Sequence, residues 1–259
     1  MKKSILITGA ASGIGKETAL YFAEQNWFVG LFDLNEKGVT SLGELIGQNN
    51  CCYGQMDVTN PDSVAAGVLL FAEKKGQKMD LLFNCAGVLF MGLHENIGLT
   101  NQKKTVDINL MGTLNLIHAC LPLLKGTKGA AIINMSSASA VYGTPELAVY
   151  SATKHAIRGL TESLNIEFEP LDIHVSDIMV SFVATPMVLE ADHRATSLTR
   201  LKAEITPQIV AQAVFKAYSH RKVHYHVGGL LKILIFSTLL LPFAKRFLIK
   251  TIGFSKTAT

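Results

Sequence analysis

Two side chains four residues apart, Tyr150 and Lys154, carry the clearest chemistry in this sequence. Residues at that spacing lie on the same face of a helix, so a phenol and an ammonium group would be neighbours there. Ser137 lies a short distance upstream. The spacing alone is common and is a weak signal, so its meaning depends on what else the chain contains.

A glycine-rich segment near the N-terminus indicates what chemistry Tyr150 and Lys154 could serve. Residues 8–15 read Thr-Gly-Ala-Ala-Ser-Gly-Ile-Gly and directly follow an apolar run. A strand, a glycine-rich turn and a helix start leave backbone N–H groups free to bind a pyrophosphate. Gly9 permits the tight turn, and Gly13 lets the backbone approach the phosphates. Gly15 allows the helix to pack closely on the sheet. A hydride-transfer enzyme needs an acid beside a nucleotide cofactor, and this sequence offers both. The alternative is that residues 8–15 form an ordinary glycine-containing loop.

Asp33 bears on the choice of cofactor. It follows the second apolar run, about twenty residues after the turn, where a carboxylate accepts hydrogen bonds from ribose hydroxyls and repels a 2′-phosphate. No Arg or Lys lies between Gly9 and Gly15 to bind such a phosphate. The sequence therefore predicts NAD in preference to NADP, and the alternative is that Asp33 is a solvated acid at a strand end.

Strand-like and helix-like segments alternate along the chain. The apolar runs are Ser4–Thr8, Phe28–Phe32, Cys52–Met56, Leu81–Asn84, Ala130–Met135, Ile173–Val180 and Val223–Val227. The amphipathic stretches are Lys16–Gln25, Ser63–Lys74, Thr105–Leu124, Tyr150–Glu167 and Pro207–Ser219. This alternation predicts an α/β Rossmann-like domain over residues 1–229, with a doubly wound parallel sheet of about seven strands and helices on both faces. A hydrophobic helical extension, residues 230–259, follows it.

Composition excludes several classes of protein. The 259 residues are 49% hydrophobic and 17% charged, with a net charge of +4, and no cluster of Lys and Arg is interleaved with aromatic residues. Nucleic acid is therefore not an expected partner.

The four cysteines lack metal or disulfide spacing, and the first apolar run is too short for a signal peptide, so a cytoplasmic protein is expected. The histidines of residues 220–226 have no cysteine or paired carboxylate beside them, and no metal site is predicted.

Independent motifs in the same order make the chain resemble the short-chain dehydrogenase/reductase family, in its compact single-domain branch, over residues 4 to about 229. The motifs are the turn Thr8-Gly9-x-x-x-Gly13-Ile14-Gly15, the adenine-pocket pair Asp57-Val58, Asn84-Cys85-Ala86-Gly87 with Cys in place of a second Asn, Asn109 before Gly112, and Ser137, Tyr150 and Lys154 at the usual spacing. The resemblance implies that Tyr150 exchanges a proton with the substrate oxygen, which Ser137 orients. Lys154 would hold the nicotinamide ribose, and Asn109 would position a water linking Lys154 to solvent.

The proton donor requires a tuned pKa. A free tyrosine has a pKa of about 10, and a neighbouring Lys154 ammonium with an oxidised nicotinamide is expected to lower it. Hydride passes directly between substrate carbon and nicotinamide, so no metal is needed. The plain alternatives are a packing role for Tyr150, a solvated charge for Lys154 and a helix-kinking role for Asn109. Ser137 is preferred to Ser136 and Ser139 because it has the family's separation from Tyr150.

The resemblance also implies a set of cofactor-binding residues. They are Gly9, Ala11, Ser12, Gly13, Ile14, Gly15, Asp33, Asp57, Val58, Asn84, Ala86, Gly87, Tyr150, Lys154, Val183 and Thr185. One departure follows the sixth strand, where the family's Pro-Gly is replaced by Val180-Ser181. Thr185 still matches the residue that binds the carboxamide. Residues 186–206 match the family's mobile substrate lid.

The C-terminal extension contains an almost wholly apolar run from Ile233 to Ala244, followed by Lys245, Arg246 and Lys250. The run is shorter than the ~20 residues that a spanning helix needs. It could lie on a membrane surface, in a dimer interface or over an apolar substrate pocket. Basic residues beside an apolar helix favour the membrane, so residues 230–250 predict peripheral contact at the inner face of one.

The substrate is expected to be a lipophilic secondary alcohol or ketone, such as a steroid, a retinoid or an acyl derivative. This expectation depends on apolar residues near the expected pocket, which are Phe90, Met91, Leu93, Val141, Leu147 and Met187. The resemblance implies a homodimer or homotetramer that assembles through Thr105–Leu124 and Tyr150–Glu167. An NADP-dependent ketoreductase and a non-catalytic, membrane-associated dinucleotide-binding scaffold or sensor are the alternative functions.

Overall fold

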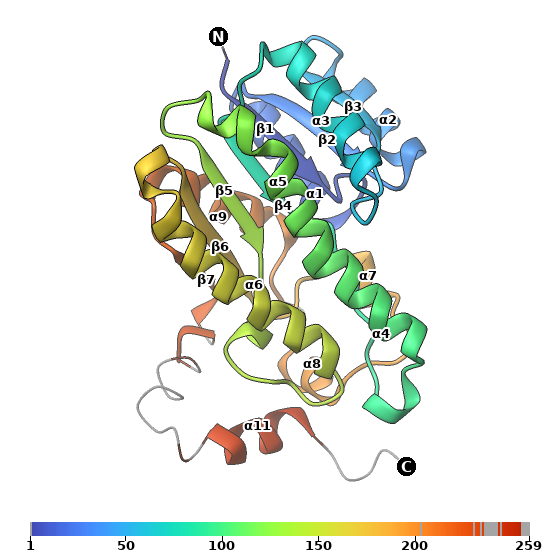
Figure 1. The fold of residues 1–259 in the computed structure, drawn as a ribbon. Helices are drawn as coiled ribbons and strands as arrows, with labels where there is room; N and C mark the ends of the chain where they lie inside the picture. Colours follow the sequence, from blue (N-terminus) through green and yellow to red (C-terminus); the bar gives the residue numbers. More distant parts are fainter. Residues whose placement is uncertain are drawn as a thin grey trace.

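A seven-stranded, wholly parallel sheet forms the centre of the protein (Figure 1). The computed structural model describes residues 2–202, 204–229, 231–233, 235, 243 and 245–254. The strands are β1 (Ser4–Thr8), β2 (Phe28–Asp33), β3 (Cys51–Gln55), β4 (Leu81–Asn84), β5 (Ala131–Met135), β6 (His174–Val180) and β7 (His224–Val227). Their order across the sheet is β3-β2-β1-β4-β5-β6-β7. The predicted doubly wound Rossmann-like architecture is confirmed.

Helices cover both faces of the sheet. The longer ones are α1 (Gly13–Glu24), α2 (Glu36–Ile46), α3 (Pro61–Lys75), α4 (Leu99–Val106), α5 (Gly112–Lys125), α6 (Ala148–Glu167), α9 (Pro207–His220) and α11 (Lys245–Gly253). The short ones are η1 (His94–Asn96), the π-helical turn η2 (Asp107–Met111), η3 (Ala138–Ala140), η4 (Glu169–Leu171), α7 (Pro186–Leu189) and α8 (Thr196–Leu201). Helices α1, α2 and α9 pack on one face, and α3, α5 and α6 on the other.

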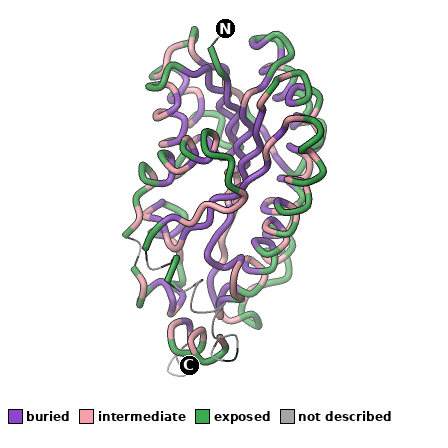
Figure 2. The backbone as a smooth tube through the Cα atoms, turned by 90° about the vertical axis from the view of Figure 1, so that its left-hand side faces the viewer, coloured by how far each residue is buried: buried purple, intermediate pink, exposed green. Residues whose placement is uncertain are grey.

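The strands are buried on both sides, which explains why they read as continuous apolar runs rather than alternating ones. In β1, Ile5 and Ile7 belong to the core cluster under α1 and α9, whereas Leu6 belongs to the cluster under α3 and α5. Figure 2 shows the buried backbone concentrated in the sheet and the exposed residues on the outer turns of the helices. Each fully buried aliphatic side chain of this kind stabilises the fold by about 1.5–3 kcal/mol.

The order of the strands creates the site. The chain runs from β1 through β2 to β3 on one side, then crosses to β4 and continues through β7 on the other. The loops after β1 and β4 therefore diverge at the carboxyl edge of the sheet, and ligands of such sheets bind in the crevice between them.

Predicted boundaries differ from the observed ones by a few residues. Helix α3 begins at Pro61 rather than Ser63, because the Asn60 side chain caps it by accepting hydrogen bonds from the backbone N–H groups of Asp62 and Ser63. The predicted helix Thr105–Leu124 begins earlier, at Leu99, and contains the π-turn η2. Most of the predicted apolar run in the extension lies outside the described residues.

One continuous helix, Leu99–Lys125, is the only one in the described parts of the chain that is long and apolar enough to cross a membrane. It comprises α4, η2 and α5. Its inward side chains, among them Leu116 and Cys120, are buried in the core beneath the sheet. The core helix of a soluble domain passes the same test, so this helix is assigned to the core.

Candidate active site

The turn after β1 can be built only from glycine at its critical positions. Gly9 has a φ of +70°, and a Cβ there would lie 2.9 Å from the Cα of Ala86. Gly13 has a φ of +52°. A Cβ on Gly15 would collide with the carbonyl group of Gly9, so the helix could not pack this closely on the turn. The predicted reasons for Gly9 and Gly15 agree with this geometry, and the approach of the phosphates to Gly13 stays a prediction.

The start of α1 is open to a ligand. Ser12 occupies the N-cap position but makes no side-chain capping hydrogen bond, so the first N–H groups of the helix keep their capacity to bind an anion. Gly13, Ile14 and Gly15 line the adjacent cavity. This cradle fits the pyrophosphate of a dinucleotide, which would be held by backbone N–H groups and the positive end of the helix.

Asp33 lies beside this turn at the end of β2. Its Oδ2 accepts a hydrogen bond from the backbone N–H of Ala11 at 3.0 Å, and its Oδ1 accepts one from Asn35 at 2.9 Å. It also lines the cavity. The carboxylate is therefore held in place by the turn, with its negative charge at the cavity wall, and is not a freely solvated strand-end acid.

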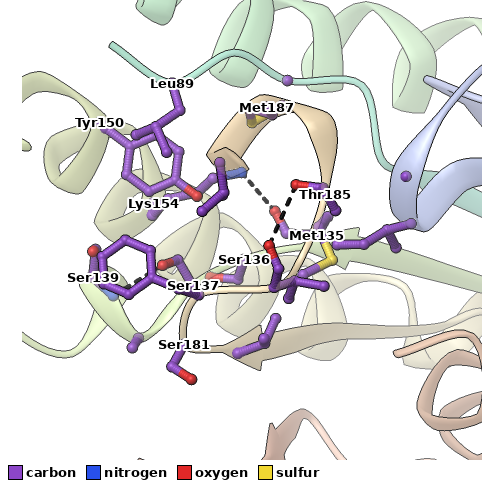
Figure 3. Close-up of a pocket in the computed structure, with 18 of the residues that line it drawn as sticks. Leu89, Met135, Ser136, Ser137, Ser139, Tyr150, Lys154, Ser181, Thr185 and Met187 are labelled. Carbon is purple, nitrogen blue, oxygen red and sulfur yellow. Dashed lines mark hydrogen bonds between the residues drawn. The ribbon is translucent and has the colours of Figure 1, made fainter. Parts of the chain in front are cut away.

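The catalytic candidates meet around this same cavity (Figure 3). Helix α6 carries Tyr150 and Lys154, and the Lys154 Nζ lies 5.4 Å from the centre of the Tyr150 ring. That ammonium nitrogen donates a hydrogen bond to the Met135 carbonyl oxygen at 2.8 Å, which fixes α6 to the end of β5. Ser137 follows β5, and its hydroxyl accepts a hydrogen bond from the Ser139 N–H at 3.1 Å.

Neighbouring serines have other roles. The Ser139 hydroxyl is 3.0 Å from the Thr144 hydroxyl and is occupied by that hydrogen bond. The Ser136 hydroxyl is buried and has no hydrogen-bond partner in the described ranges of the chain, although Ser136 also lines the cavity. Of these three serines, Ser137 alone affects the pKa of Tyr150, through a side-chain hydrogen bond that lowers it.

Burial sets the protonation of the pair. It raises the pKa of Tyr150 to about 12, although the hydrogen bond from Ser137 opposes this shift. Burial lowers the pKa of Lys154 to about 8. Burial raises the pKa of this phenol, and the expectation that Lys154 together with an oxidised nicotinamide lowers it stays a prediction. Tyr150 is therefore a neutral phenol that can donate a proton.

Asn109 lies in the π-turn η2, a type of helix irregularity that is frequent at functional sites. Its Oδ1 accepts from the Val88 N–H at 2.8 Å, and its Nδ2 donates to the Val88 carbonyl oxygen at 2.9 Å. Both groups of the side chain are thus committed to the loop after β4. The amide holds that loop beside the cavity, and the water-positioning role remains a prediction.

The loop after β6 is shaped without the family's Pro-Gly. Val183 forms a short parallel bridge with Ile205, and the Ala184 N–H donates to the Ile205 carbonyl oxygen at 2.9 Å. The Thr185 N–H donates to the Val183 carbonyl oxygen at 2.8 Å. These hydrogen bonds keep Val183 and Thr185 on the cavity wall despite Val180-Ser181.

Twelve of the predicted residues line one cavity of about 290 Å³. They are Gly9, Ser12, Gly13, Ile14, Gly15, Asp33, Gly87, Ser137, Tyr150, Lys154, Val183 and Thr185. The predicted residues outside its wall are Ala11, Asp57, Val58, Asn84, Ala86 and Asn109. Asn84, for example, donates to the Asn134 side chain at 2.9 Å inside the core, where it links β4 to β5.

Sequence reasoning missed much of the substrate end of the cavity. Of the six apolar residues expected there, only Leu147 and Met187 line it. The wall also includes Leu89, Tyr142, Thr144, Phe182, Val188, Ser197 and Leu201. Val188 belongs to α7, and Ser197 and Leu201 belong to α8, all within residues 186–206, which the family resemblance marked as a substrate lid. The other four residues come from loops, and no local pattern in the sequence marks them.

The fold, the turn and the convergent Ser, Tyr and Lys define the class of protein. The chain belongs to the short-chain dehydrogenase/reductase family, since it matches the short chain dehydrogenase family over residues 3–196. It is 34% identical over 223 residues to oxidoreductase UcpA of Escherichia coli (strain K12), covering 85% of this chain and 82% of that protein. It is 29% identical to a cyclohexanol dehydrogenase of Acinetobacter sp. (strain SE19), covering 82% and 86%.

Solved structures share the fold. A short chain dehydrogenase/reductase from Burkholderia phymatum in complex with NAD has a TM-score of 0.84 at 23% identity, covering 94% of this chain and 95% of that one. A 3-ketoacyl-(acyl-carrier-protein) reductase from Brucella melitensis complexed with NADH has a TM-score of 0.79 at 27% identity, covering 88% and 97%. ElxO with NADP bound has a TM-score of 0.78 at 24% identity, covering 88% and 98%. The chain is an NAD(P)-dependent oxidoreductase that acts on CH–OH or carbonyl groups.

Proposed function

We propose that this protein interconverts a secondary alcohol and a ketone with NAD(H), using Tyr150 as the general acid and base. The observation that carries the proposal is the convergence of Tyr150, Lys154 and Ser137 with the glycine-rich turn on one cavity. A bound nicotinamide dinucleotide supplies the hydride acceptor or donor.

The chain's own residues handle the proton. During reduction the neutral Tyr150 hydroxyl donates its proton to the substrate oxygen, which also accepts a hydrogen bond from the Ser137 hydroxyl. The Lys154 ammonium stabilises the tyrosinate that remains, since an opposite charge nearby favours the ionised form. During oxidation the same groups act in reverse, and tyrosinate removes the proton from the alcohol.

The preference for NAD is supported by Asp33, whose charge lies at the cavity wall next to the turn. A 2′-phosphate near this carboxylate would be repelled. The test is a fluorescence titration of the purified protein with NADH and with NADPH at the same salt concentration. We expect NADH to bind at least about tenfold more tightly, a difference of about 1.4 kcal/mol.

Variants separate this role from a general effect of charge. Asp33→Asn keeps the shape of the side chain and should abolish most of the preference by strengthening NADPH binding. Asp62→Asn removes an exposed acid at the start of α3 and should leave the ratio unchanged. Tighter binding of NADPH by the wild type would instead favour the NADP-dependent ketoreductase.

A lipophilic substrate is supported by the cavity wall, where Leu89, Leu147, Phe182 and Met187 surround the space beyond Tyr150. Apolar walls bind apolar groups by excluding water from both surfaces. Oxidation of such an alcohol with NAD would also exclude the non-catalytic scaffold.

Peripheral membrane contact through residues 230–250 remains a proposal. It is supported by Phe243, which is 82% exposed, and Phe247, which is 71% exposed beside the exposed Arg246 and Lys250. Aromatic and basic groups together bind anionic lipid surfaces. Wild-type protein should sediment with phosphatidylserine vesicles and not with phosphatidylcholine vesicles, and Phe247→Ala should weaken this binding. A cytoplasmic protein attached to the inner face of a membrane would result.

A further inference from the structure

A second, smaller cavity lies between the active site and the C-terminal helix α11. Its walls are Tyr142, Thr144, Pro145, Ser197, Leu248, Ile249, Ile252 and Gly253, and we refer to it as the tail chamber. Three of these residues, Tyr142, Thr144 and Ser197, also line the active-site cavity. The two spaces are therefore neighbours separated by shared side chains.

Helix α11 is fixed over this chamber by contacts at both of its ends. The Lys245 Nζ donates a hydrogen bond to the Val141 carbonyl oxygen at 3.0 Å. The Arg200 guanidinium of α8 donates to the Thr251 carbonyl oxygen. Gly253 is buried so close to Pro145 that a Cβ there would lie 3.0 Å from the proline ring. Figure 1 shows α11 lying beside α8, far from the N-terminus.

The two faces of α11 differ. Leu248, Ile249 and Ile252 point into the chamber and are partly buried, whereas Phe247 on the opposite side is exposed. The chamber wall is apolar apart from two hydroxyl-bearing residues and the Tyr142 phenol. An apolar cavity does not hold water well, so hydrocarbon is the chemistry that fits it.

Ser197 indicates that the ligand also has a polar atom. Ser197 is 3% exposed, and its hydroxyl has no hydrogen-bond partner among the residues that the structure describes. A buried hydroxyl without a partner is unfavourable and calls for a specific explanation. Because Ser197 lies on the wall shared by the two cavities, a ligand oxygen at that point would complete its hydrogen bonding.

We propose that the tail chamber binds the hydrocarbon tail of the substrate, and that Ser197 donates a hydrogen bond to a second substrate oxygen between the reacting carbon and the tail. The substrate class is thus an amphiphilic secondary alcohol or ketone with an ester-like or ether-like oxygen near its centre. This inference rests on the proposed function, since Tyr150 must receive the reacting oxygen.

The chamber has a volume of about 20 Å³, which is room for about one methyl-sized group. A longer tail must therefore displace the half-buried Leu248 and Ile249 side chains along the seam between α8 and α11. The polar contacts that hold α11 involve Lys245 and the Thr251 carbonyl oxygen, so they do not fix the Leu248 and Ile249 side chains themselves.

Three alcohols test the proposal with NAD⁺. They are 2-hydroxypropyl octanoate, 2-hydroxypropyl acetate with a short tail, and 2-dodecanol, which has the long tail without the ester. Ile249→Trp fills the chamber and should lower kcat/KM for the octanoate at least about tenfold, while the acetate changes less than about twofold. Phe247→Trp is the matched control on the outer face and should change neither value.

The Ser197 contact is tested separately. Ser197→Ala should lower kcat/KM for the octanoate about fivefold, the loss of one hydrogen bond, and leave 2-dodecanol nearly unchanged. Equal losses on all three alcohols would indicate a general disturbance of α8 and would overturn the role of Ser197. Equal effects of Ile249→Trp on the long and short esters, or no effect, would overturn the tail chamber.

Failure of the proposed function is distinguishable from failure of this inference. If the wild type oxidised none of the three alcohols, the proposed function would fail for this class of substrate. Calorimetric binding of 2-dodecanol to the NADH-saturated wild type and to Ile249→Trp would still decide the chamber, because equal affinities would overturn it.

Discussion

At the scale of single residues, burial raises the pKa of Tyr150 and lowers the pKa of Lys154, and both shifts have the same physical cause. Each side chain loses hydration in its charged form, so the pKa of the phenol rises to about 12 and that of the ammonium falls to about 8. Burial thus shifts both groups toward their neutral forms, although the Lys154 ammonium is still mostly charged at pH 7. Negative phosphates and a positive nicotinamide are what would restore the charged forms when a cofactor binds.

Replacement of Tyr150 tests the proton transfer. We expect Tyr150→Phe to lower kcat by about 10²–10⁴, the usual contribution of a positioned general acid, with little change in the Kd for NADH. Steady-state oxidation of an alcohol and fluorescence titration measure the two quantities. Tyr142→Phe removes another phenol from the same wall and should retain most of the activity. Full activity in Tyr150→Phe would exclude the assigned role.

The pH dependence of cofactor binding tests Lys154. Because its pKa is lowered to about 8, the ammonium is charged at pH 7 and mostly neutral at pH 9. NADH affinity should therefore fall about fivefold as the pH rises through 8, since a hydrogen bond from a charged donor is the stronger one. Titrations between pH 6.5 and 9.5, in steps of about half a unit, would locate the midpoint. Lys154→Met should bind weakly with no such step, and a step retained in this variant would assign it to another group.

At the scale of elements, a polar row crosses four strands on the α6 side of the sheet. Asn84, Asn134, Asp177 and His224 are successive neighbours in the registers of β4 to β7. The fully buried Asp177 accepts from the His224 Nδ1 at 3.0 Å, and the His224 Nε2 lies 3.1 Å from Glu162 on α6. These interactions attach the edge strand β7 to β6 and to α6.

Stability should fall as the pH rises because of this attachment. The hydrogen bond to Asp177 raises the pKa of His224, and burial raises the pKa of Asp177. A group whose folded pKa is raised contributes its stability below its unfolded pKa and loses it as the pH rises through the folded value. The contribution of His224 is therefore complete below about pH 6.5 and declines above it.

Urea unfolding of the wild type and of His224→Gln between about pH 5.5 and 8.5 measures this effect. The stability of the variant should depend less on pH than that of the wild type. His220→Gln is the control, because the His220 ring is exposed and its hydrogen bond in the described part of the chain is to the Lys216 carbonyl oxygen of its own helix. Identical pH profiles for the wild type and His224→Gln would show that the attachment has no net effect.

At the scale of the whole molecule, α5 and α6 lie on the same face of the sheet, and no helix or strand that the structure describes covers their outer surfaces (Figure 1). On α6 the exposed stripe includes Ala152, Gly159 and Ser163, small residues that let another helix approach closely. Together with the family resemblance, this supports a homodimer or homotetramer.

The assembly can be tested at Gly159. A Cβ at this position would meet no atom of the described residues within 4 Å, so a side chain there should not disturb the isolated chain. Light scattering after gel filtration should give a multiple of 28.1 kDa for the wild type and a smaller assembly for Gly159→Arg, with unchanged circular dichroism. Gly98→Arg, at another open position before α4, should keep the wild-type mass. A wild-type monomer would exclude this assembly.

Much of the architecture and the centre of the site could be predicted, because these features depend on residues close together in the chain. Alternation of apolar strands and amphipathic helices marks a parallel sheet, and the register of Gly9, Gly13 and Gly15 reflects local backbone geometry. The spacing of Tyr150 and Lys154 likewise follows from one turn of one helix.

Burial and the contacts between segments far apart in the sequence were decided only by the tertiary structure. The sequence could not show that burial raises the pKa of Tyr150, because desolvation depends on every segment packed around the ring. Nor could it show that Asn84 is committed to the core, or that Ser197 of α8 and Ile249 of α11 share a chamber beside the active site. Local pattern determined the elements and the reacting groups, whereas packing between distant segments determined their protonation and the shape of the space in front of them.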